Sequence, residues 1–277
     1  MSSLYLPKYS LRRLRRIQTM INQLHPETEP GALMVPGSPL PQGNIIVFPA
    51  SFNPPTNAHL ALLKQARRFI RMQDSQNWRL YAAFSKLTVD KEAVERPLLL
   101  DRVALLRLLL NRYLPRTGIL LTNRGLYVEQ AEGIRRSFPT VQRIFFLIGY
   151  DKIVQIFDPR YYHDRDASLS ELFRLAELLV APRGSSGPAA LETLLQQPQN
   201  QCFARYVHPL PFSTAYRAVS STQVRQALGT AHVPREVYRF MHDTRAYAPP
   251  RNQRNGTTID DYAERVKRLR RLGIPLP

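Results

Sequence analysis

The chain is 277 residues long, which suits one large domain or two small ones. Hydrophobic residues make up 44% of it and charged residues 22%, values that are typical of a packed globular protein and exclude a mainly disordered or collagen-like chain. Lys and Arg number 39 against 21 Asp and Glu, a formal net charge of +18, so we expect polyanionic partners such as nucleotides, nucleic acids or acidic membrane surfaces.

The sequence contains one cysteine, Cys202, which excludes an internal disulfide and a thiolate-rich metal site and fits a reducing compartment. The longest apolar stretch, 98–110, is interrupted by Asp101, Arg102 and Arg107 and falls well short of the ~20 residues that a membrane span needs. We therefore expect no membrane span. We expect the protein inside the cell, in the cytoplasm or nucleus, and the acid-free basic N-terminus leaves mitochondria open as an alternative.

The N-terminal residues predict a basic amphipathic helix, because residues 1–26 contain no acid and five Lys or Arg. Apolar side chains recur there at helical spacing, at Leu11, Leu14, Ile17, Ile21 and Leu24. We interpret the segment as a helix docked on the body of the protein, with a mitochondrial presequence as the alternative. Residues 26–43 contain five Pro and three Gly, which we interpret as a linker, so 1–43 forms an N-terminal extension.

An alternation of strands and helices begins at residue 44. Residues 44–48 are an apolar run that ends at Pro49 and suits a strand buried on both faces. A loop rich in Asn and Pro follows, and a helical period then runs to about Met72. The pattern continues with strands at 80–84, 118–121, 143–148 and 178–180, helices at 99–114 and 129–137, and a helix starting near Asp151.

Because parallel neighbours need crossover connections, this alternation predicts a doubly wound parallel α/β sheet over residues 44–245. The remaining residues, 246–277, are rich in Pro, Arg and Asn and end in a basic helical pattern at 262–272. We interpret them as a basic C-terminal tail, either a tail helix or a partly disordered arm.

A polar loop, Ser51–His59, joins the first predicted strand to its helix. Ligands of open α/β sheets bind at the carboxyl ends of strands, where helix N-termini offer free N–H groups to phosphate. Thr56 and His59 are three residues apart, so a helix that begins near Thr56 directs both side chains to one face of its first turn. The loop therefore predicts a phosphate site. The alternative is that Thr56 only caps the helix and His59 is an ordinary buried residue.

A second hydroxyl-rich helix start lies far downstream, at Val219–Arg225. Ser220, Ser221 and Thr222 supply hydroxyls, and the guanidinium of Arg225 in the first turn can reach the same anion. Taken alone, this segment is better explained as a Ser/Thr helix cap. Its pairing with the first loop favours a second phosphate-binding element.

Three segments, in chain order, resemble the motifs of one superfamily. Ser51–His59 resembles the (T/H)xGH segment of the nucleotidyltransferases, and Val219–Arg225 resembles their I-S-S-T-x-x-R segment. Between them, Leu-Ile-Gly-Tyr-Asp at 147–151 is similar to the G-x-D element of the nicotinamide or nicotinate mononucleotide adenylyltransferases, and 151–163 is most similar to their fungal, filamentation-linked relatives. The resemblance spans most of 44–241 and implies a Rossmann-like nucleotidyltransferase fold, here with an N-terminal helical extension and C-terminal helices.

The resemblance implies transfer of AMP from MgATP to a mononucleotide with release of pyrophosphate, as in NAD biosynthesis. Carried over by position, the catalytic groups are Thr56, His59 and Arg225. The implied ATP contacts are Ser51, Phe52, His59, Ser220, Ser221, Thr222 and Arg225. The implied acceptor contacts are Gly149, Asp151, Tyr161 and Tyr162.

The chemistry of this reaction fits such residues. A phosphate monoester has a second pKa of ≈ 6, so the acceptor is already largely an anionic nucleophile and no general base is required. Catalysis is then positioning and electrostatic stabilisation of the phosphates, which cations and N–H groups supply. One Mg²⁺ held mainly by phosphate oxygens and water suffices, so we expect no protein-built metal site.

Two departures from the family concern the third residue of the (T/H)xGH pattern and the aromatic residue that follows G-x-D. Ala58 stands where the pattern has Gly, which adds a methyl group near the ATP. The tryptophan that follows G-x-D in the family is replaced by Phe157, Tyr161 and Tyr162, and Trp78, the single tryptophan, lies far upstream. Stacking on the pyridine ring could pass to a tyrosine, which leaves the acceptor open.

A third departure is the lysine-containing segment expected after the second strand, which is poorly kept at 84–91. Lys86 or Lys91 either contacts phosphate there or is a solvated surface residue. Arg183, which follows the last predicted strand, resembles an arginine of the family and is a further candidate at the sheet edge.

Two other functions stay open. An ATP-binding or ATP-hydrolysing relative that has lost pyridine nucleotide transfer accounts for the departures above. A basic nucleic-acid-binding protein accounts for the +18 charge, but it is the less favoured reading, because the Arg and Lys are scattered among two terminal arms and several helices without a known RNA or DNA module. The sequence also leaves a homo-oligomer open.

Overall fold

A seven-stranded sheet forms the centre of the part of the chain that the structure describes. The computed structural model describes residues 11–73, 77–87, 96–227, 231–252 and 257–276. The strands are β1 (Ala32–Met34), β2 (Gly43–Pro49), β3 (Trp78–Ser85), β4 (Gly118–Thr122), β5 (Val141–Gly149), β6 (Glu177–Ala181) and β7 (Val207–Pro209). Their order is β1-β4-β3-β2-β5-β6-β7, and every neighbouring pair is parallel except β1 with β4.

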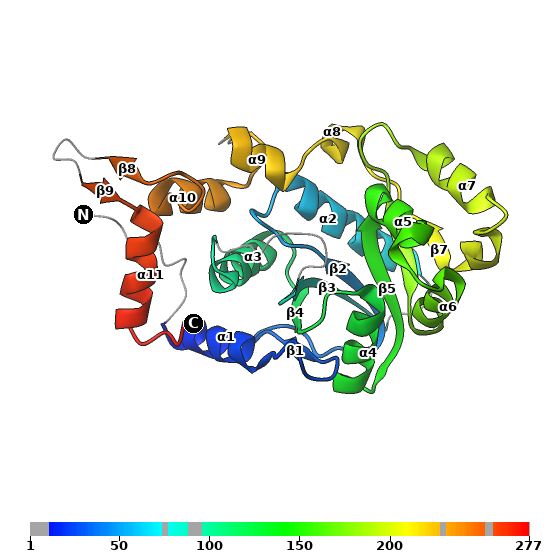
Figure 1. Cartoon of the computed structure of the whole chain (residues 1–277), viewed down its shortest axis with the longest axis horizontal. Helices are drawn as coiled ribbons and strands as arrows, with labels where there is room; N and C mark the ends of the chain where they lie inside the picture. Colours follow the sequence, from blue (N-terminus) through cyan, green and yellow to red (C-terminus); the bar gives the residue numbers. More distant parts are fainter. Residues whose placement is uncertain (1–10, 74–76, 88–95, 228–230, 253–256, 277) are drawn as a thin grey trace.

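Helices connect the strands and flank the sheet (Figure 1). They are α1 (Leu11–Gln23), α2 (Asn57–Arg71), α3 (Leu99–Tyr113), α4 (Tyr127–Ser137), α5 (Tyr150–Phe157), α6 (Arg165–Leu175), α7 (Pro188–Gln196), α8 (Thr214–Arg217), α9 (Ser221–Ala227), α10 (Arg235–Thr244) and α11 (Asp261–Arg271). Shorter elements are the 3₁₀ turns η1 (Pro159–Tyr161) and η2 (Gln201–Tyr206) and the antiparallel pair β8 (Arg251–Asn252) and β9 (Thr258–Ile259). Within the described ranges, every helix is too short or too polar to cross a bilayer.

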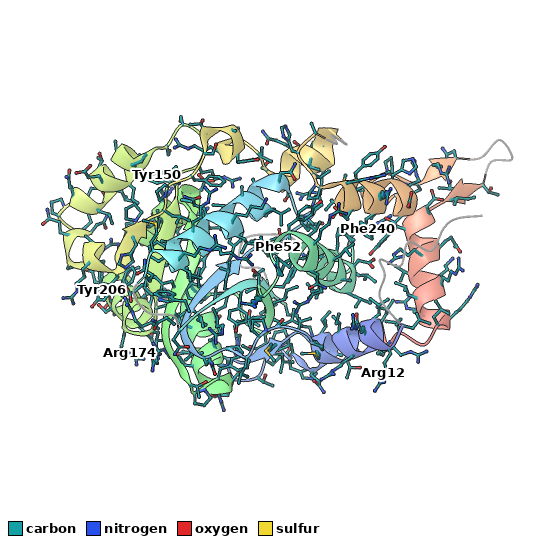
Figure 2. All side chains as sticks on the ribbon, turned by 180° about the vertical axis from the view of Figure 1, so that it is seen from behind. Arg12, Phe52, Tyr150, Arg174, Tyr206 and Phe240 are labelled. Carbon is teal, nitrogen blue, oxygen red and sulfur yellow. The ribbon has the colours of Figure 1, made fainter. Side chains whose placement is uncertain are left out.

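Alternate side chains of β2 enter two different cores, one on each face of the sheet. Ile46 and Phe48 pack with apolar residues of α1, α2, α3, α10 and α11, whereas Ile45 and Val47 pack with those of α4, α5 and α6. Side chains fill the space on both sides of the sheet (Figure 2). A strand buried on both faces has no polar side, which is why 45–48 is a continuous apolar run. The predicted Rossmann-like, doubly wound α/β fold is confirmed.

The strand order changes direction between β2 and β5. From β2 the chain builds β3 and then β4 on one side, and then returns to place β5, β6 and β7 on the other. At such a switch point the connections leave the sheet in opposite directions, which opens a crevice at the carboxyl ends of the two strands. The loop 50–56 after β2 and residues 149–151 after β5 lie at this edge.

The N-terminal helix is docked, as predicted. Leu14, Ile17 and Ile21 of α1 are 1–6% exposed and belong to the same core as β2 and α3. Arginines occupy the opposite, exposed side of α1. The helix therefore belongs to the body of the domain.

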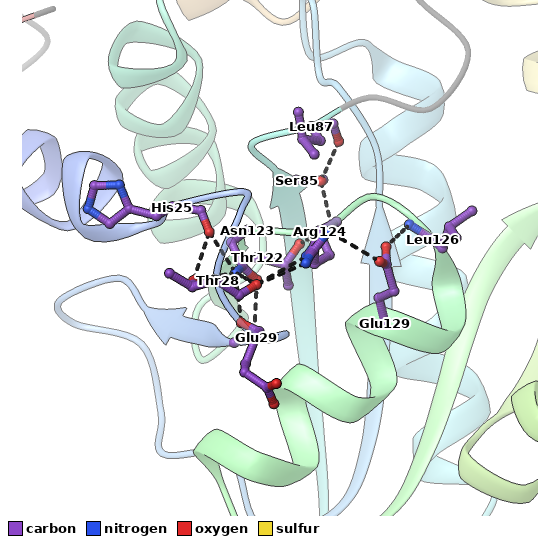
Figure 3. A network of polar contacts seen from close by, with 11 residues as sticks. His25, Thr28, Glu29, Ser85, Leu87, Thr122, Asn123, Arg124, Leu126 and Glu129 are labelled. Atoms are coloured by element: carbon purple, nitrogen blue, oxygen red, sulfur yellow. Dashed lines mark hydrogen bonds and ion pairs between the residues drawn. The ribbon is translucent and has the colours of Figure 1, made fainter.

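The predicted linker at 26–43 contains a strand. Ala32–Met34 forms β1 and pairs antiparallel with β4, with Leu33 opposite Leu121. The buried side chain of Asn123 holds the turn before it, since its Nδ2 donates to the carbonyl oxygens of His25 (3.0 Å) and Glu29 (2.9 Å) (Figure 3). An edge strand pairs on one side only and tolerates nearby prolines. The Pro- and Gly-rich composition of 26–43 therefore predicted its bends but not its strand.

The C-terminal segment contains the predicted helix, α11, and this helix is packed on the body. Tyr262, Arg265 and Leu269 are buried. The guanidinium of Arg265 lies 2.6 Å from the carboxylate of Asp101 on α3, and the Tyr262 hydroxyl donates to the same carboxylate at 2.7 Å. Tyr262 and Leu269 thus share the core of α3, so of the two interpretations the tail helix describes α11.

Candidate functional site

The start of α2 is fixed by a reciprocal cap between Thr56 and His59. The hydroxyl of Thr56 accepts the main-chain N–H of His59 (3.4 Å), and Nδ1 of His59 accepts the main-chain N–H of Thr56 (2.9 Å). Because Nδ1 is an acceptor, we assign the proton of the neutral ring to Nε2. The two side chains lie together, as predicted, with the Thr56 hydroxyl 2.9 Å from Nδ1 of His59. Thr56 is 1% exposed and caps the helix, whereas His59 is half-buried and not the ordinary buried residue of the alternative interpretation.

Two aromatic rings, one from β2 and one from the loop after it, pack against the imidazole of His59. The ring centroid of Phe52 is 5.0 Å from that of His59, and that of Phe48 is 5.8 Å away. Phe52 is fully buried and has a left-handed backbone (φ = 43°), a conformation that an L residue keeps only when its surroundings impose it. His59 itself is half-buried beside these two rings.

Helix α9 is bonded to the loop that precedes α2. Nη1 of Arg225 donates to the carbonyl oxygen of Asn53, and the hydroxyl of Ser221 donates to that of Pro54 (2.8 Å). Nη2 of Arg225 also donates to the hydroxyl of Thr222 (3.1 Å). The two predicted phosphate-binding segments are therefore neighbours in space.

Ser220 has a different surrounding from its two neighbours. Its hydroxyl accepts the main-chain N–H of Gln223 (3.1 Å), and its own N–H donates to the Gln223 side chain (3.0 Å). This is the helix-cap arrangement that was the simpler explanation of the segment. Ser220 shapes the start of α9, whereas Ser221 and Arg225 connect α9 to the loop after β2.

The structure adds a buried guanidinium behind the loop. Arg102 on α3 is 8% exposed, and its Nη1 donates to the carbonyl oxygen of Ser51 (3.1 Å). Its buried Nε has no hydrogen-bond partner among the described residues. Burial lowers the pKa of Arg102, although the group remains protonated because its ordinary pKa is far above neutrality. The sequence signal for it was a charge inside the apolar run 98–110, which alone does not distinguish a buried arginine from a surface one.

Asn53 joins this loop to the C-terminal part of the chain. Its side chain is 3% exposed; Oδ1 accepts the hydroxyl of Tyr247 (2.8 Å), and Nδ2 donates to the carbonyl oxygen of Arg96 (3.4 Å). Burial raises the pKa of Tyr247, so its hydroxyl stays protonated and donates. Sequence reasoning missed both residues, since nothing local connects positions 194 residues apart.

Three of the residues predicted for the far side of the site, Gly149, Asp151 and Arg183, lie together. Gly149 ends β5 opposite Ala181 of β6, so the residues that follow the two strands share one edge. Nε of Arg183 lies 2.6 Å from the carboxylate of Asp151. A Cβ added at Gly149 would lie 3.5 Å from Cδ of Arg183, an ordinary van der Waals contact, so this packing does not by itself require a glycine.

The other predicted acceptor and lysine positions are engaged elsewhere or open to solvent. The hydroxyl of Tyr162 donates to the carbonyl oxygen of Ile156 (2.7 Å), and burial raises its pKa. Tyr161 is 57% exposed. Nζ of Lys86 donates to the carbonyl oxygen of Leu24, which ties it to the N-terminal extension. Lys91 lies outside the described residues.

The described residues of this site would suit Mg²⁺ only when the ion is already coordinated to a bound nucleotide. In the described part of the chain, no three His, Cys, Asp or Glu side chains gather in a way that could hold a metal. The loop and α9 offer hydroxyls, an imidazole and a guanidinium, and the carboxylate of Asp151 faces Arg183. Mg²⁺ would therefore take its ligands from phosphate oxygens and water, which it prefers to retain.

Comparisons with known proteins add little to this geometry. No family model and no curated protein matches the chain. Among solved structures, the chain is similar to a Vibrio parahaemolyticus protein provisionally described as a nicotinate-nucleotide adenylyltransferase, with 12% identity over 73% of this chain and 99% of that one, and a TM-score of 0.28. A score this low carries no argument about family or activity, so the fold assignment stands on strand order and register alone.

Proposed function

We propose that the protein transfers AMP from MgATP to nicotinamide or nicotinate mononucleotide, forming the dinucleotide and releasing pyrophosphate. The observation that carries the proposal is the contact of α9 with the loop after β2, made by Ser221 and Arg225. Two hydroxyl-bearing segments far apart in the chain thereby meet beside the switch point of the sheet, where α/β proteins bind nucleotides. A triphosphate bound by both segments requires this arrangement.

Each group in the proposal has an electrostatic role. Arg225 brings a permanent positive charge to the loop. His59 presents an Nε2–H whose direction is set by the hydrogen bond that Nδ1 accepts from the main-chain N–H of Thr56. The acceptor phosphate is already anionic, so these groups have to hold charges in place and stabilise the departing pyrophosphate. When bound, Mg²⁺ would neutralise part of the phosphate charge while coordinated to the nucleotide and water.

The direct experiment incubates the protein with ATP, Mg²⁺ and one mononucleotide at a time, and measures the dinucleotide and pyrophosphate. We expect both products in equal amounts with at least one of the two acceptors. ATP binding without any dinucleotide, at high protein concentration, would contradict the proposal.

A second candidate is an ATP-hydrolysing relative without pyridine nucleotide transfer. It is favoured by the acceptor side, where Asp151 is paired with Arg183 and the Tyr162 hydroxyl is bonded to main chain. A further incubation with ATP and Mg²⁺ but no mononucleotide separates the two candidates, because only the hydrolysing relative then releases ADP or AMP.

A further inference from the structure

Basic residues from both ends of the chain meet on one surface. The guanidinium of Arg15 on α1 donates to the carbonyl oxygens of Leu272 and Gly273, just after α11 (3.1 Å to Gly273). Nδ2 of Asn22, two turns further along, donates to the carbonyl oxygen of Pro275 (2.7 Å). The end of α11 therefore lies against α1, and the two helices form one corner of the molecule (Figure 1).

Seven arginines of these two helices define what we call the basic face. All seven side chains are exposed. They are Arg12, Arg13, Arg15 and Arg16 of α1 and Arg268, Arg270 and Arg271 of α11. Figure 2 labels Arg12 at this corner, beside α11.

The basic face contains little opposing charge of its own. No acidic residue occurs in α1. The two acids of α11, Asp261 and Glu264, lie in its first turn, away from α1, and Glu264 pairs with Lys267 (2.8 Å). Positive charge is consequently concentrated where the end of α11 meets the beginning of α1.

From this arrangement we infer that the basic face binds the sugar–phosphate backbone of nucleic acid. Guanidinium groups make bidentate contacts with phosphate, and the basic face presents seven of them. Arginines from Arg12 to Arg16 extend over ~6 Å of helix and continue onto α11, which is more than one phosphate group requires and suits a repeating polyanion. Phosphate contacts carry no sequence information, so we expect a face of exposed arginines to bind independently of sequence.

A membrane surface fits this face less well. A helix that lies on a bilayer inserts apolar side chains between the lipids. In α1 these side chains, Leu14, Ile17 and Ile21, are packed into the core, and Leu269 of α11 is fully buried. The basic face therefore offers a bilayer positive charge without apolar side chains to insert. Positive charge alone is sufficient to bind a nucleic-acid backbone. The face shares no residue with the candidate nucleotide site, so this inference does not depend on the proposed transfer reaction.

The experiment measures binding of the full-length protein to a fluorescent 20-nucleotide single strand of mixed sequence by anisotropy, at several salt concentrations. One variant replaces four face arginines, R12Q/R16Q/R268Q/R271Q, and leaves Arg15 in its bond to the end of α11. The matched control, K64Q/R68Q/R71Q/R116Q, removes four exposed cations outside the basic face. Both variants lower the net charge equally, and thermal unfolding verifies that both are folded.

We expect the wild type to bind with an affinity that falls steeply with salt. The face variant should bind at least tenfold more weakly, and its slope of log K against log salt should be smaller by about 3, at ~0.7 for each lost single-strand contact. The control should remain within about threefold of the wild type.

Three results would overturn the inference. The first is a wild type that does not bind at low salt, and the second is an equal loss in both variants, which would reduce the effect to net charge. The third is that the wild type binds phosphatidylserine vesicles more tightly than the oligonucleotide and that the face variant loses this vesicle binding. The partner would then be a membrane.

Discussion

The two ring nitrogens of His59 have different roles, because Nδ1 already accepts a hydrogen bond from the main-chain N–H of Thr56. Nδ1 belongs to the cap of α2, so any contribution to phosphate binding has to come from Nε2. Phe52 and Phe48 restrict the ring further. The cap and the proposed binding role can therefore be removed separately.

For His59→Asn we expect a folded protein with impaired transfer. The asparagine Oδ1 can accept the Thr56 N–H in place of Nδ1, but nothing replaces the Nε2–H. His59→Ala removes both and should also lose ~1 kcal/mol of unfolding free energy, the usual value of a cap. We expect kcat/KM to fall about 100-fold in each variant, measured beside urea unfolding. Full activity of the asparagine variant would make His59 purely structural.

Arg225 contacts Asn53 and Thr222 through different nitrogens, and an ammonium cannot reproduce that fork. Arg225→Lys keeps the charge, so we expect kcat/KM for ATP to fall roughly tenfold or more with little change in stability. The control is Arg239→Lys, at an exposed position of α10. Equal kinetics in the wild type and the Arg225 variant would remove Arg225 from the site.

At the scale of elements, the two terminal helices are held in different ways. Sequence periodicity was sufficient for α1, because its apolar stripe faces the core. The position of α11 depends on polar contacts as well: Arg265 with Asp101, and the N-cap Asp260 with Arg96. No local pattern predicts such pairs, since each joins residues more than 160 positions apart.

Asp260 makes the docking of α11 sensitive to acid. Burial alone would raise the pKa of Asp260, but hydrogen bonds from Arg96 and from the amides of Ala263 and Tyr262 outweigh it, and the pKa lies below its ordinary 3.8. A group with a lowered folded pKa stabilises the fold above its unfolded pKa, and that contribution is lost as the pH falls through the folded value.

We therefore expect Asp260→Asn, which keeps a capping side chain, to be less stable than the wild type at pH 7. The difference in urea unfolding free energy should shrink below about pH 4, as the wild-type carboxylate takes up its proton. A difference that stays constant from pH 7 to pH 3 would show that the ion pair with Arg96 contributes nothing.

At the scale of the whole molecule, segments from both ends of the chain support the central sheet. The N-terminal extension supplies α1 and β1, and the C-terminal segment reaches the loop after β2 through Tyr247 and Asn53. The loop that begins the candidate site is thus bonded to α9 on one side and to the C-terminal segment on the other.

Tyr247→Phe tests that long-range support. Removing the hydroxyl leaves Oδ1 of the buried Asn53 without its donor, so we expect a loss of ~1 kcal/mol or more of unfolding free energy. Hydrogen exchange of the main-chain amides at 51–53 and 56–57 should become faster. Tyr238→Phe on α10, where the side chain is 41% exposed, is the control and should change neither. Unchanged exchange in the Tyr247 variant would show that the loop after β2 does not depend on the Tyr247–Asn53 hydrogen bond.

Much of the architecture followed from local patterns. A strand buried on both faces has to be apolar throughout, a crossover helix has to separate parallel strands, and a Thr-x-x-His start can cap itself; each of these rules acts within one to twenty residues. The order of strands and helices from 44 to 157 and the Thr56–His59 pair were accordingly predictable, whereas the separate helix α6 was not predicted. The short edge strand β1 was not, because three residues paired on one side leave no periodic signal.

Contacts between distant residues were decided by packing, and no pattern in the chain encodes them locally. The bond of Arg225 to the loop, the buried Arg102 and the Tyr247–Asn53 pair all depend on how the sheet orders its strands and where the terminal segments return. The same packing turned two basic runs at opposite ends of the chain into one surface. Charge can be counted in a sequence, but its concentration at one place requires the fold, because electrostatic attraction depends on distance in space.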